Sequence, residues 1–256
     1  MNLEKTTAFV TGANRGIGRS LVRALLDRGV RRVYASARGE KSLEALLREG
    51  GGRVLGMQLD VTKPVEIAAA ASRASDVTLL FNNAGVIGSQ NLLKSDRRAL
   101  ELDFATNFYG VLDVTRAFLP ALEKDGSGGV VNLLTLLCYS SIPALGGYSA
   151  AKAAALSLTQ ALRAELRPRH VAVYGVFPGA VDTDMIRGFE MPKTSPDLVA
   201  NAILDGLAKG DEDIYPDPMS RDLAAKYRAD PKSLEPLSYT HLRAHQTTQD
   251  LVSRLL

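Results

Sequence analysis

The chain has 256 residues, of which 46% are hydrophobic and 23% are charged, a composition typical of a globular protein rather than a disordered one. Its 31 basic and 28 acidic residues give a net charge of +3 and are interspersed, without the Lys/Arg blocks that bind nucleic acid. A single cysteine, Cys138, excludes an internal disulfide and any multi-cysteine metal site. The three histidines leave little material for a zinc centre, so we expect no metal.

Residues 126–151 carry no charge, which raises the question of a membrane span. Polar residues, glycine and proline interrupt this stretch, among them Asn132, Ser140 and Pro143, so the hydropathy criteria argue against a span. The first residues, Met-Asn-Leu-Glu-Lys, lack the apolar core of a signal peptide. We therefore expect a cytoplasmic protein that does not contact a membrane.

Short apolar runs alternate with longer segments of helical period. The pattern predicts strands at 7–10, 32–36, 54–59, 77–81, 130–134, 171–176 and 214–215. It predicts helices at 17–28, 42–48, 65–73, 102–122, 148–166 and 197–208, the last with Ser195 as its N-cap and Pro196 at its first position.

This alternation favours parallel strands joined by crossover helices, and continuously apolar strands indicate a sheet that is covered on both faces. We find no linker and no internal repeat. The predicted fold class is therefore α/β, a doubly wound parallel sheet in three layers (αβα), forming a single domain over residues 1–236.

The last residues differ in composition from the rest of the chain. Residues 237–256 hold two of the three histidines, and the string Leu237-Ser-Tyr-Thr-His-Leu-Arg-Ala-His resembles translated sequencing-adapter or vector DNA. We therefore expect a native chain that ends near Pro236 with a foreign tail appended. The alternative is a genuine C-terminal helix.

The first predicted strand leads into a glycine-rich turn, Thr11-Gly12-Ala13-Asn14-Arg15-Gly16-Ile17-Gly18. Gly12 permits a tight turn, Gly16 lets the backbone approach a pyrophosphate, and Gly18 lets helix and strand pack closely. The N–H groups and the positive end of the following helix then bind the anion. A glycine-rich turn alone is weak evidence, but its place between the first strand and the first helix predicts nucleotide binding.

Three later motifs point to a family. Asn82-Asn83-Ala84-Gly85 follows the fourth predicted strand, Tyr148 and Lys152 form a Tyr-x3-Lys pair, and Pro178-Gly179-Ala180-Val181-Asp182-Thr183 comes later in the chain. Together with the spacing Gly-x3-Gly-x-Gly, these motifs resemble the short-chain dehydrogenase/reductase family over residues 6 to about 215. The resemblance implies a Rossmann fold, a nicotinamide cofactor and oxidoreductase activity. It places the phosphate contacts at Gly12, Asn14, Arg15, Gly16, Ile17 and Gly18.

The second predicted strand should end beside the adenosine ribose, where a carboxylate would favour NAD. That stretch is Ala35-Ser36-Ala37-Arg38, which has no acid, and Arg38 and Ser36 offer a guanidinium and a hydroxyl to a 2′-phosphate. Arg15 adds a second cation, so we predict NADP(H); the alternative is that Arg38 is an ordinary surface residue. The resemblance implies adenine and ribose contacts at Asp60, Val61, Asn83, Ala84 and Gly85, and nicotinamide contacts at Pro178, Gly179, Val181 and Thr183.

Tyr148 and Lys152 are four residues apart in a predicted helix, so their side chains share a face. A nearby ammonium should lower the pKa of the phenol, which otherwise lies near 10. Tyr148 would give its proton to the carbonyl oxygen during hydride transfer and take it back in the reverse direction. Lys152 would also hydrogen-bond the nicotinamide ribose.

The resemblance supplies two more catalytic positions. The family has a serine thirteen residues before its tyrosine, and here that position is Thr135, which keeps the hydroxyl but adds a methyl group. We take Thr135 as the equivalent; Ser140 or Ser141 could substitute, or Thr135 could be a core residue of a weakened enzyme. Asn107 matches the family's catalytic asparagine, which helps to hold a water linked to the lysine.

The segment after the nicotinamide motif is apolar at Met185, Ile186, Phe189 and Met191, with Arg187 and Glu190 as its charges. We therefore expect an apolar ketone, aldehyde or secondary alcohol as substrate. The two long predicted helices resemble those of the family's dimer contact and predict a homodimer or homotetramer. An alternative is a non-catalytic NADP(H)-binding or sensing protein on the same fold. The glycine spacing and the lack of a substrate domain argue against a nucleotide-sugar epimerase or dehydratase.

Overall fold

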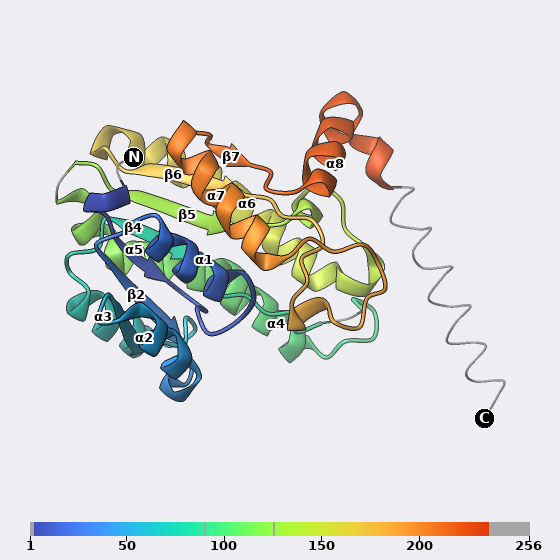
Figure 1. Cartoon of the computed structure of the whole chain (residues 1–256). Helices are drawn as coiled ribbons and strands as arrows, with labels where there is room; N and C mark the ends of the chain where they lie inside the picture. The colour runs from blue at the N-terminus through green and yellow to red at the C-terminus, as the bar shows by residue number, and fades with distance from the viewer. Residues whose placement is uncertain (1–2, 90, 125, 236–256) are drawn as a thin grey trace.

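The computed structural model describes residues 3–89, 91–124 and 126–235 (Figure 1). Its centre is a sheet in which the described residues form seven strands in the order β3-β2-β1-β4-β5-β6-β7, and every neighbouring pair is parallel. The predicted doubly wound parallel sheet is therefore confirmed. The strands are β1 (Thr7–Val10), β2 (Arg32–Ala37), β3 (Val54–Gln58), β4 (Leu79–Asn82), β5 (Gly129–Leu133), β6 (Ala172–Val176) and β7 (Asp213–Ile214).

Helices cover both faces of the sheet because the strand side chains alternate between two apolar clusters. Ala8 and Val10 of β1 belong to the cluster covered by α1 (Gly16–Asp27), α2 (Glu44–Gly50) and α7 (Pro196–Lys209). Phe9, between them, packs on the other face against Phe118, with their ring centroids 4.5 Å apart. That face is covered by α3 (Pro64–Arg73), α5 (Gly110–Glu123) and α6 (Gly146–Leu166).

The helix expected over 102–122 is divided into three parts. It begins earlier as α4 (Arg97–Phe104), capped by the Asp96 side chain, passes through the π-helical turn η3 (Ala105–Tyr109), and continues as α5. Asn107 lies at the middle of η3, and its side-chain amide donates to the backbone carbonyl of Asp103 at 2.9 Å. A π-helical turn of this kind often marks a functional site.

Helix α8 (Pro218–Ala229) was not predicted. It begins with Asp217 as its N-cap, which accepts from the Ser220 backbone N–H, while the Ser220 hydroxyl accepts from the Asp217 N–H. α8 has only two large aliphatic side chains, Met219 and Leu223, which gave little sign of its amphipathic period. The remaining short turns are η1 (Leu3–Lys5), η2 (Glu40–Leu43), η4 (Leu136–Cys138), η5 (Pro143–Leu145), η6 (Arg167–Arg169), η7 (Asp184–Ile186) and η8 (Pro231–Leu234).

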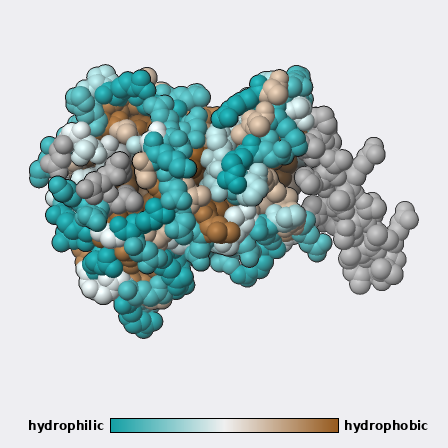
Figure 2. All heavy atoms as spheres, turned by 45° about the horizontal axis from the view of Figure 1, so that its top comes forward, coloured by the Kyte–Doolittle hydropathy of each residue, from teal (hydrophilic) through white to brown (hydrophobic). Residues whose placement is uncertain are grey.

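Hydrophilic side chains cover most of the face drawn in Figure 2, and hydrophobic ones show in patches between them. Across the residues that the structure describes, no helix combines the length and the apolar character that a membrane span requires. The tail predicted to be foreign, residues 237–256, lies outside the described residues.

Candidate active site

Residues at or just after the carboxyl ends of the strands line one cavity of about 980 Å³. In the sheet, β2 and β3 lie on one side of β1 and β4 to β7 on the other, so the strand order reverses between β1 and β4. Ligands of open α/β sheets bind at such a switch point. All predicted site residues line the cavity except Ser36 and Asn107: they are Gly12, Asn14, Arg15, Gly16, Ile17, Gly18, Arg38, Asp60, Val61, Asn83, Ala84, Gly85, Thr135, Tyr148, Lys152, Pro178, Gly179, Val181 and Thr183.

The glycine turn has a backbone that other residues would not tolerate. Gly12 and Gly16 have φ values of +64° and +52°, in the left-handed region. A Cβ at Gly18 would lie 2.2 Å from the Gly12 carbonyl oxygen, so helix α1 can approach the turn only with glycine there. The N-cap of α1, Arg15, makes no capping hydrogen bond with its side chain, which leaves the first N–H groups of the helix available for an anion.

Asn83 and Thr11 brace this turn against the end of β4. The Thr11 hydroxyl accepts from the backbone N–H groups of Asn83 and Ala84, both at 2.9 Å. The Asn83 amide donates to the Thr11 carbonyl at 2.9 Å and to the Gly12 carbonyl at 3.1 Å. Asn83 therefore shapes the phosphate turn, a role that its motif did not reveal, although it also lines the cavity.

At the end predicted for adenosine, Arg38, Lys41 and Ser42 line the cavity beside Asp60. Burial opposes ionisation of Asp60, but hydrogen bonds from the Thr62 N–H and hydroxyl lower its pKa overall. Lys41 adds a cation that the sequence analysis did not single out. Arg15 is exposed and lies 3.5 Å from Asp184 of η7.

The expectation for Ser36 needs correction, because this residue is fully buried and its hydroxyl donates to the Val10 carbonyl at 3.3 Å. Ser36 lies inside the sheet and does not line the cavity, since successive side chains of a strand point to opposite faces.

Tyr148 and Lys152 both line the cavity from the first turns of α6, as their spacing predicted. Tyr148 is 9% exposed and Lys152 3%. The Lys152 nitrogen Nζ lies 5.9 Å from the centroid of the Tyr148 ring and donates to the Leu133 carbonyl at 2.6 Å. This hydrogen bond to the last residue of β5 fixes the Lys152 ammonium group beside the Tyr148 ring.

The expected lowering of the phenol pKa is wrong for this structure. Burial raises the pKa of Tyr148, and the Cys138 thiol and the Asp103 carboxylate add to the effect. Burial lowers the pKa of Lys152 to about 8. Burial is the largest cause of both shifts because the charged form of each group is costly in an apolar site. Cys138 donates its thiol hydrogen to the Lys152 carbonyl, and burial raises its pKa to about 11, which agrees with a packing role.

Thr135 is the residue directly before η4 and lines the cavity. Its hydroxyl accepts from the Leu137 N–H at 3.3 Å, which leaves the hydroxyl hydrogen available for another acceptor. Thr135 is 8% exposed, so protein covers most of its surface.

Asn107 is fully buried and does not line the cavity itself. Its amide donates to the Val86 carbonyl at 2.9 Å, and its oxygen accepts from the Val86 N–H at 3.2 Å. A Cβ at Gly85 would lie 3.1 Å from the Asn107 oxygen Oδ1 and 3.8 Å from the Lys152 Nζ. Glycine at this position therefore keeps the space between the asparagine and the lysine open.

The other end of the cavity is lined mainly by apolar side chains. It includes the four that the sequence analysis named, Met185, Ile186, Phe189 and Met191, whereas Arg187 and Glu190 do not line it. Three further residues come from the C-terminal part of the chain and were missed: Met219 and Leu223 of α8, and Leu234 of η8. No motif marks them, because they reach the cavity only through the packing of the unpredicted helix α8.

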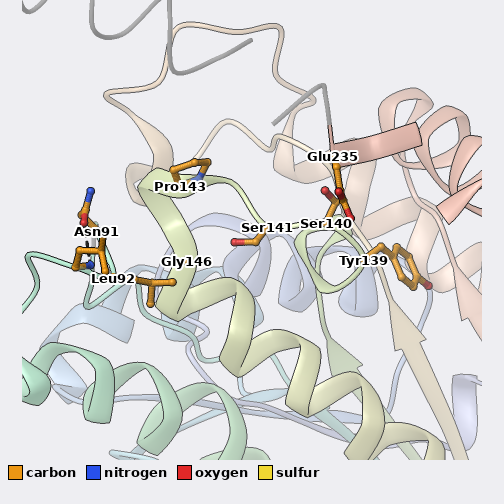
Figure 3. Close-up of a pocket in the computed structure, with 9 residues that line it drawn as sticks. Asn91, Leu92, Tyr139, Ser140, Ser141, Pro143, Gly146 and Glu235 are labelled. Atoms are coloured by element: carbon orange, nitrogen blue, oxygen red, sulfur yellow. Dashed lines mark hydrogen bonds between the residues drawn. The ribbon is translucent and has the colours of Figure 1, made fainter. Parts of the chain in front are cut away.

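Ser140, one of the alternatives to Thr135, lines this cavity and also a neighbouring one of about 520 Å³ (Figure 3). Ser141, the other alternative, lines only the second cavity, with Tyr139, Pro143, Asn91 and Glu235. The segment after β5 thus borders both spaces. Thr135 and Ser140 share the first cavity with Tyr148, whereas Ser141 does not line it.

A sequence model described as short chain dehydrogenase matches residues 6–193. The chain belongs to the short-chain dehydrogenase family. A crystal structure of a short chain dehydrogenase from Burkholderia cenocepacia J2315 in complex with NADP is 40% identical, with a TM-score of 0.86, over 91% of this chain and 97% of that one. The 3-oxoacyl-acyl-carrier-protein reductase FabG of Vibrio cholerae is 31% identical over 191 residues, which are 73% of this chain and 78% of the relative.

A further relative, the putative oxidoreductase SadH of Mycobacterium tuberculosis, is 30% identical over 234 residues, which are 82% of this chain and 85% of that protein. A short-chain dehydrogenase from Sphingobium yanoikuyae in complex with NADPH is 26% identical, with a TM-score of 0.77, over 97% of this chain and 95% of the other. Membership of this family makes the protein an NAD(P)-dependent oxidoreductase.

Proposed function

We propose that the protein is an NADP(H)-dependent reductase of apolar ketones or aldehydes. In the reverse direction it would oxidise the corresponding secondary or primary alcohols. The observation that carries this proposal is that the phosphate-binding turn and the Tyr148–Lys152 pair line the same cavity. One end of that cavity is suited to a dinucleotide, and the other, beside a proton donor, is apolar.

The residues present fit a phosphorylated dinucleotide. The Arg15 side chain does not cap the first N–H groups of α1, which are therefore available to a pyrophosphate. Arg38 and Lys41 line the cavity just after β2. The stretch Ala35–Arg38 has no carboxylate that would repel a 2′-phosphate. NADP and NADPH are the ligands in the Burkholderia cenocepacia and Sphingobium yanoikuyae complexes, which supports the same choice here.

When bound, the cofactor supplies or accepts a hydride at the nicotinamide ring. Tyr148 would donate its phenolic proton to the substrate oxygen in reduction and recover it from the alcohol in oxidation. The raised pKa of the phenol keeps that proton in place at neutral pH. Thr135 would donate a hydrogen bond to the substrate oxygen, and Lys152 would hold the ribose.

We also propose that the active form is a homodimer or homotetramer that buries the outer faces of α4, α5 and α6. Leu102 is 44% exposed and Tyr109 55%, which is unusual for large apolar side chains. On α6, Ala153, Ala154 and Leu156 are only half-buried. Light scattering at micromolar concentration should find an oligomer; a monomer would contradict this part of the proposal.

A panel of apolar ketones and aldehydes, with NADPH consumption followed by absorbance, tests the enzymatic proposal. The Tyr148→Phe variant should lose about 10²- to 10⁴-fold in kcat, the usual contribution of a general acid, while it still binds NADPH. Equal rates for wild type and variant would remove Tyr148 from the mechanism. Tight NADPH binding without turnover of any carbonyl would favour the non-catalytic alternative.

A further inference from the structure

Asp103, near the end of α4, is a buried carboxylate that the proposed mechanism does not use. Its side chain is fully buried and accepts three hydrogen bonds: from the Gly88 N–H at 2.7 Å, from the Ser89 N–H at 3.1 Å and from the Ser89 hydroxyl at 2.6 Å. A buried charge is costly unless such donors satisfy it. Asp103 and Ser89 therefore form a closed polar unit inside the protein.

This unit holds one wall of the active-site cavity. Val86 and Ile87 line the cavity directly after the Asn-Asn-Ala-Gly motif. The Asn107 side chain pairs with both the N–H and the carbonyl of Val86. The Asp103 carboxylate accepts from the backbone N–H groups of Gly88 and Ser89. Residues 86–89 are thus fixed at both ends by two side chains that lie one helical turn apart.

The same unit packs against the start of the helix that carries Tyr148. A Cβ at Gly147 would lie 2.1 Å from the Ser89 hydroxyl oxygen and 2.8 Å from Oδ2 of Asp103. Gly147 precedes Tyr148 in the first turn of α6, and the positive end of a helix favours a nearby carboxylate. Asp103 thereby contacts the cavity wall and the first turn of α6 at once.

We propose that Asp103, acting through Ser89, is a positioning residue that sets the Tyr148 phenol relative to the cavity wall at Val86 and Ile87. Asp103 touches neither substrate nor cofactor, since it does not line the cavity. Its effect should therefore fall on the chemical step more than on cofactor binding. The kinetic part of this inference depends on the proposed reductase function, whereas its structural part does not.

The test compares Asp103→Asn with Ser89→Ala and with the control Asp205→Asn. An asparagine keeps the side-chain volume but must turn its N–H₂ group towards a backbone N–H, so one hydrogen bond is lost. We expect kcat to fall about 10- to 100-fold, the effect of losing a hydrogen bond to a charged group. Kd for NADPH should change much less than kcat. Asp205→Asn makes the same chemical change on the exposed side of α7, where Asp205 pairs with Arg28, and should leave kcat unchanged.

Hydrogen exchange provides a readout that needs no turnover. In Asp103→Asn, the amides of residues 84–89 and 145–149 should exchange faster than in wild type, while those of β1 should not. Unchanged exchange in both segments, or an unchanged kcat in a folded Asp103→Asn protein, would overturn the inference.

Ser89→Ala covers the case in which Asp103→Asn does not fold, because it removes a single hydrogen bond and keeps the carboxylate. It should lower kcat by a smaller factor and speed exchange at 145–149; wild-type values for both would also overturn the inference. A wild-type protein that reduces no carbonyl would count against the proposed function instead, and exchange would still decide the role of Asp103.

Discussion

The two ends of the cavity are built in different ways. The dinucleotide end consists largely of backbone, where Gly12, Gly16 and Gly18 allow a turn that side chains would block. The substrate end consists of side chains from η7, α8 and η8, such as Ile186, Met219 and Leu234. The first end depends on backbone atoms that leave no room for a side chain. The second depends on a wall of apolar side chains that includes the unbranched Met185, Met191 and Met219, which repack readily.

The largest expected effect is that of Gly18→Ala, which tests the rigid end. The added Cβ would lie 2.2 Å from the Gly12 oxygen and 2.5 Å from the Asn83 amide nitrogen. We expect a loss of about 3 kcal/mol in the free energy of unfolding, the upper range for overpacked sites, and loss of NADPH binding. Gly188→Ala is the control near the substrate end, since a Cβ there meets nothing within 4 Å. If both variants had the same free energy of unfolding and the same affinity for NADPH, the proposed difference between the two ends of the cavity would be wrong.

Thr135→Val should have the next largest effect. It replaces the hydroxyl with a methyl group of similar shape, so kcat should fall about 10²-fold, in the range for loss of an oxyanion-hole donor, while NADPH binding is kept. Thr135→Ser should keep most of the activity because it retains the hydroxyl. Steady-state kinetics and NADPH titration of both variants check this. Near-normal turnover by the valine variant would transfer the role to Ser140 or Ser141.

Arg38→Ala should change cofactor choice at the dinucleotide end. Loss of a charged hydrogen-bond donor should lower kcat/KM with NADPH by about 10-fold or more and leave the value with NADH nearly unchanged. Arg187→Ala removes another exposed arginine, which does not line the cavity, so it should leave the preference for NADPH unaltered. A wild-type enzyme that used both cofactors equally well would already contradict this prediction.

The last prediction concerns pH. In the protein without cofactor, the pKa of Lys152 is about 8, below its ordinary value of 10.5. Between these values the unfolded chain binds a proton that the folded chain does not, so the free energy of unfolding should rise with pH, by at most about 1.4 kcal/mol per unit. Chemical denaturation across this range should show a shallower rise for Lys152→Met. Identical slopes would mean that the folded lysine stays charged.

Much of the dinucleotide end could be predicted because its residues are neighbours in sequence. Gly12 to Gly18, Asn83 to Gly85 and Pro178 to Thr183 each follow a strand, and parallel strands bring their carboxyl ends to one edge. Tyr148 and Lys152 are likewise set by helical spacing. Lys41 was missed because a single lysine in a short helix carries no pattern.

Local sequence pattern thus determined the order of strands and helices along the chain, the glycine turn and the shared face of Tyr148 and Lys152. Each of these depends on residues that lie within one or two helical turns of each other. Tertiary packing alone decided the rest. It turned the Ser36 hydroxyl into the sheet, brought α8 to the cavity and set the pKa of Tyr148 through burial. These properties depend on what surrounds a group in space, and the surrounding atoms come from elements that are far apart along the chain.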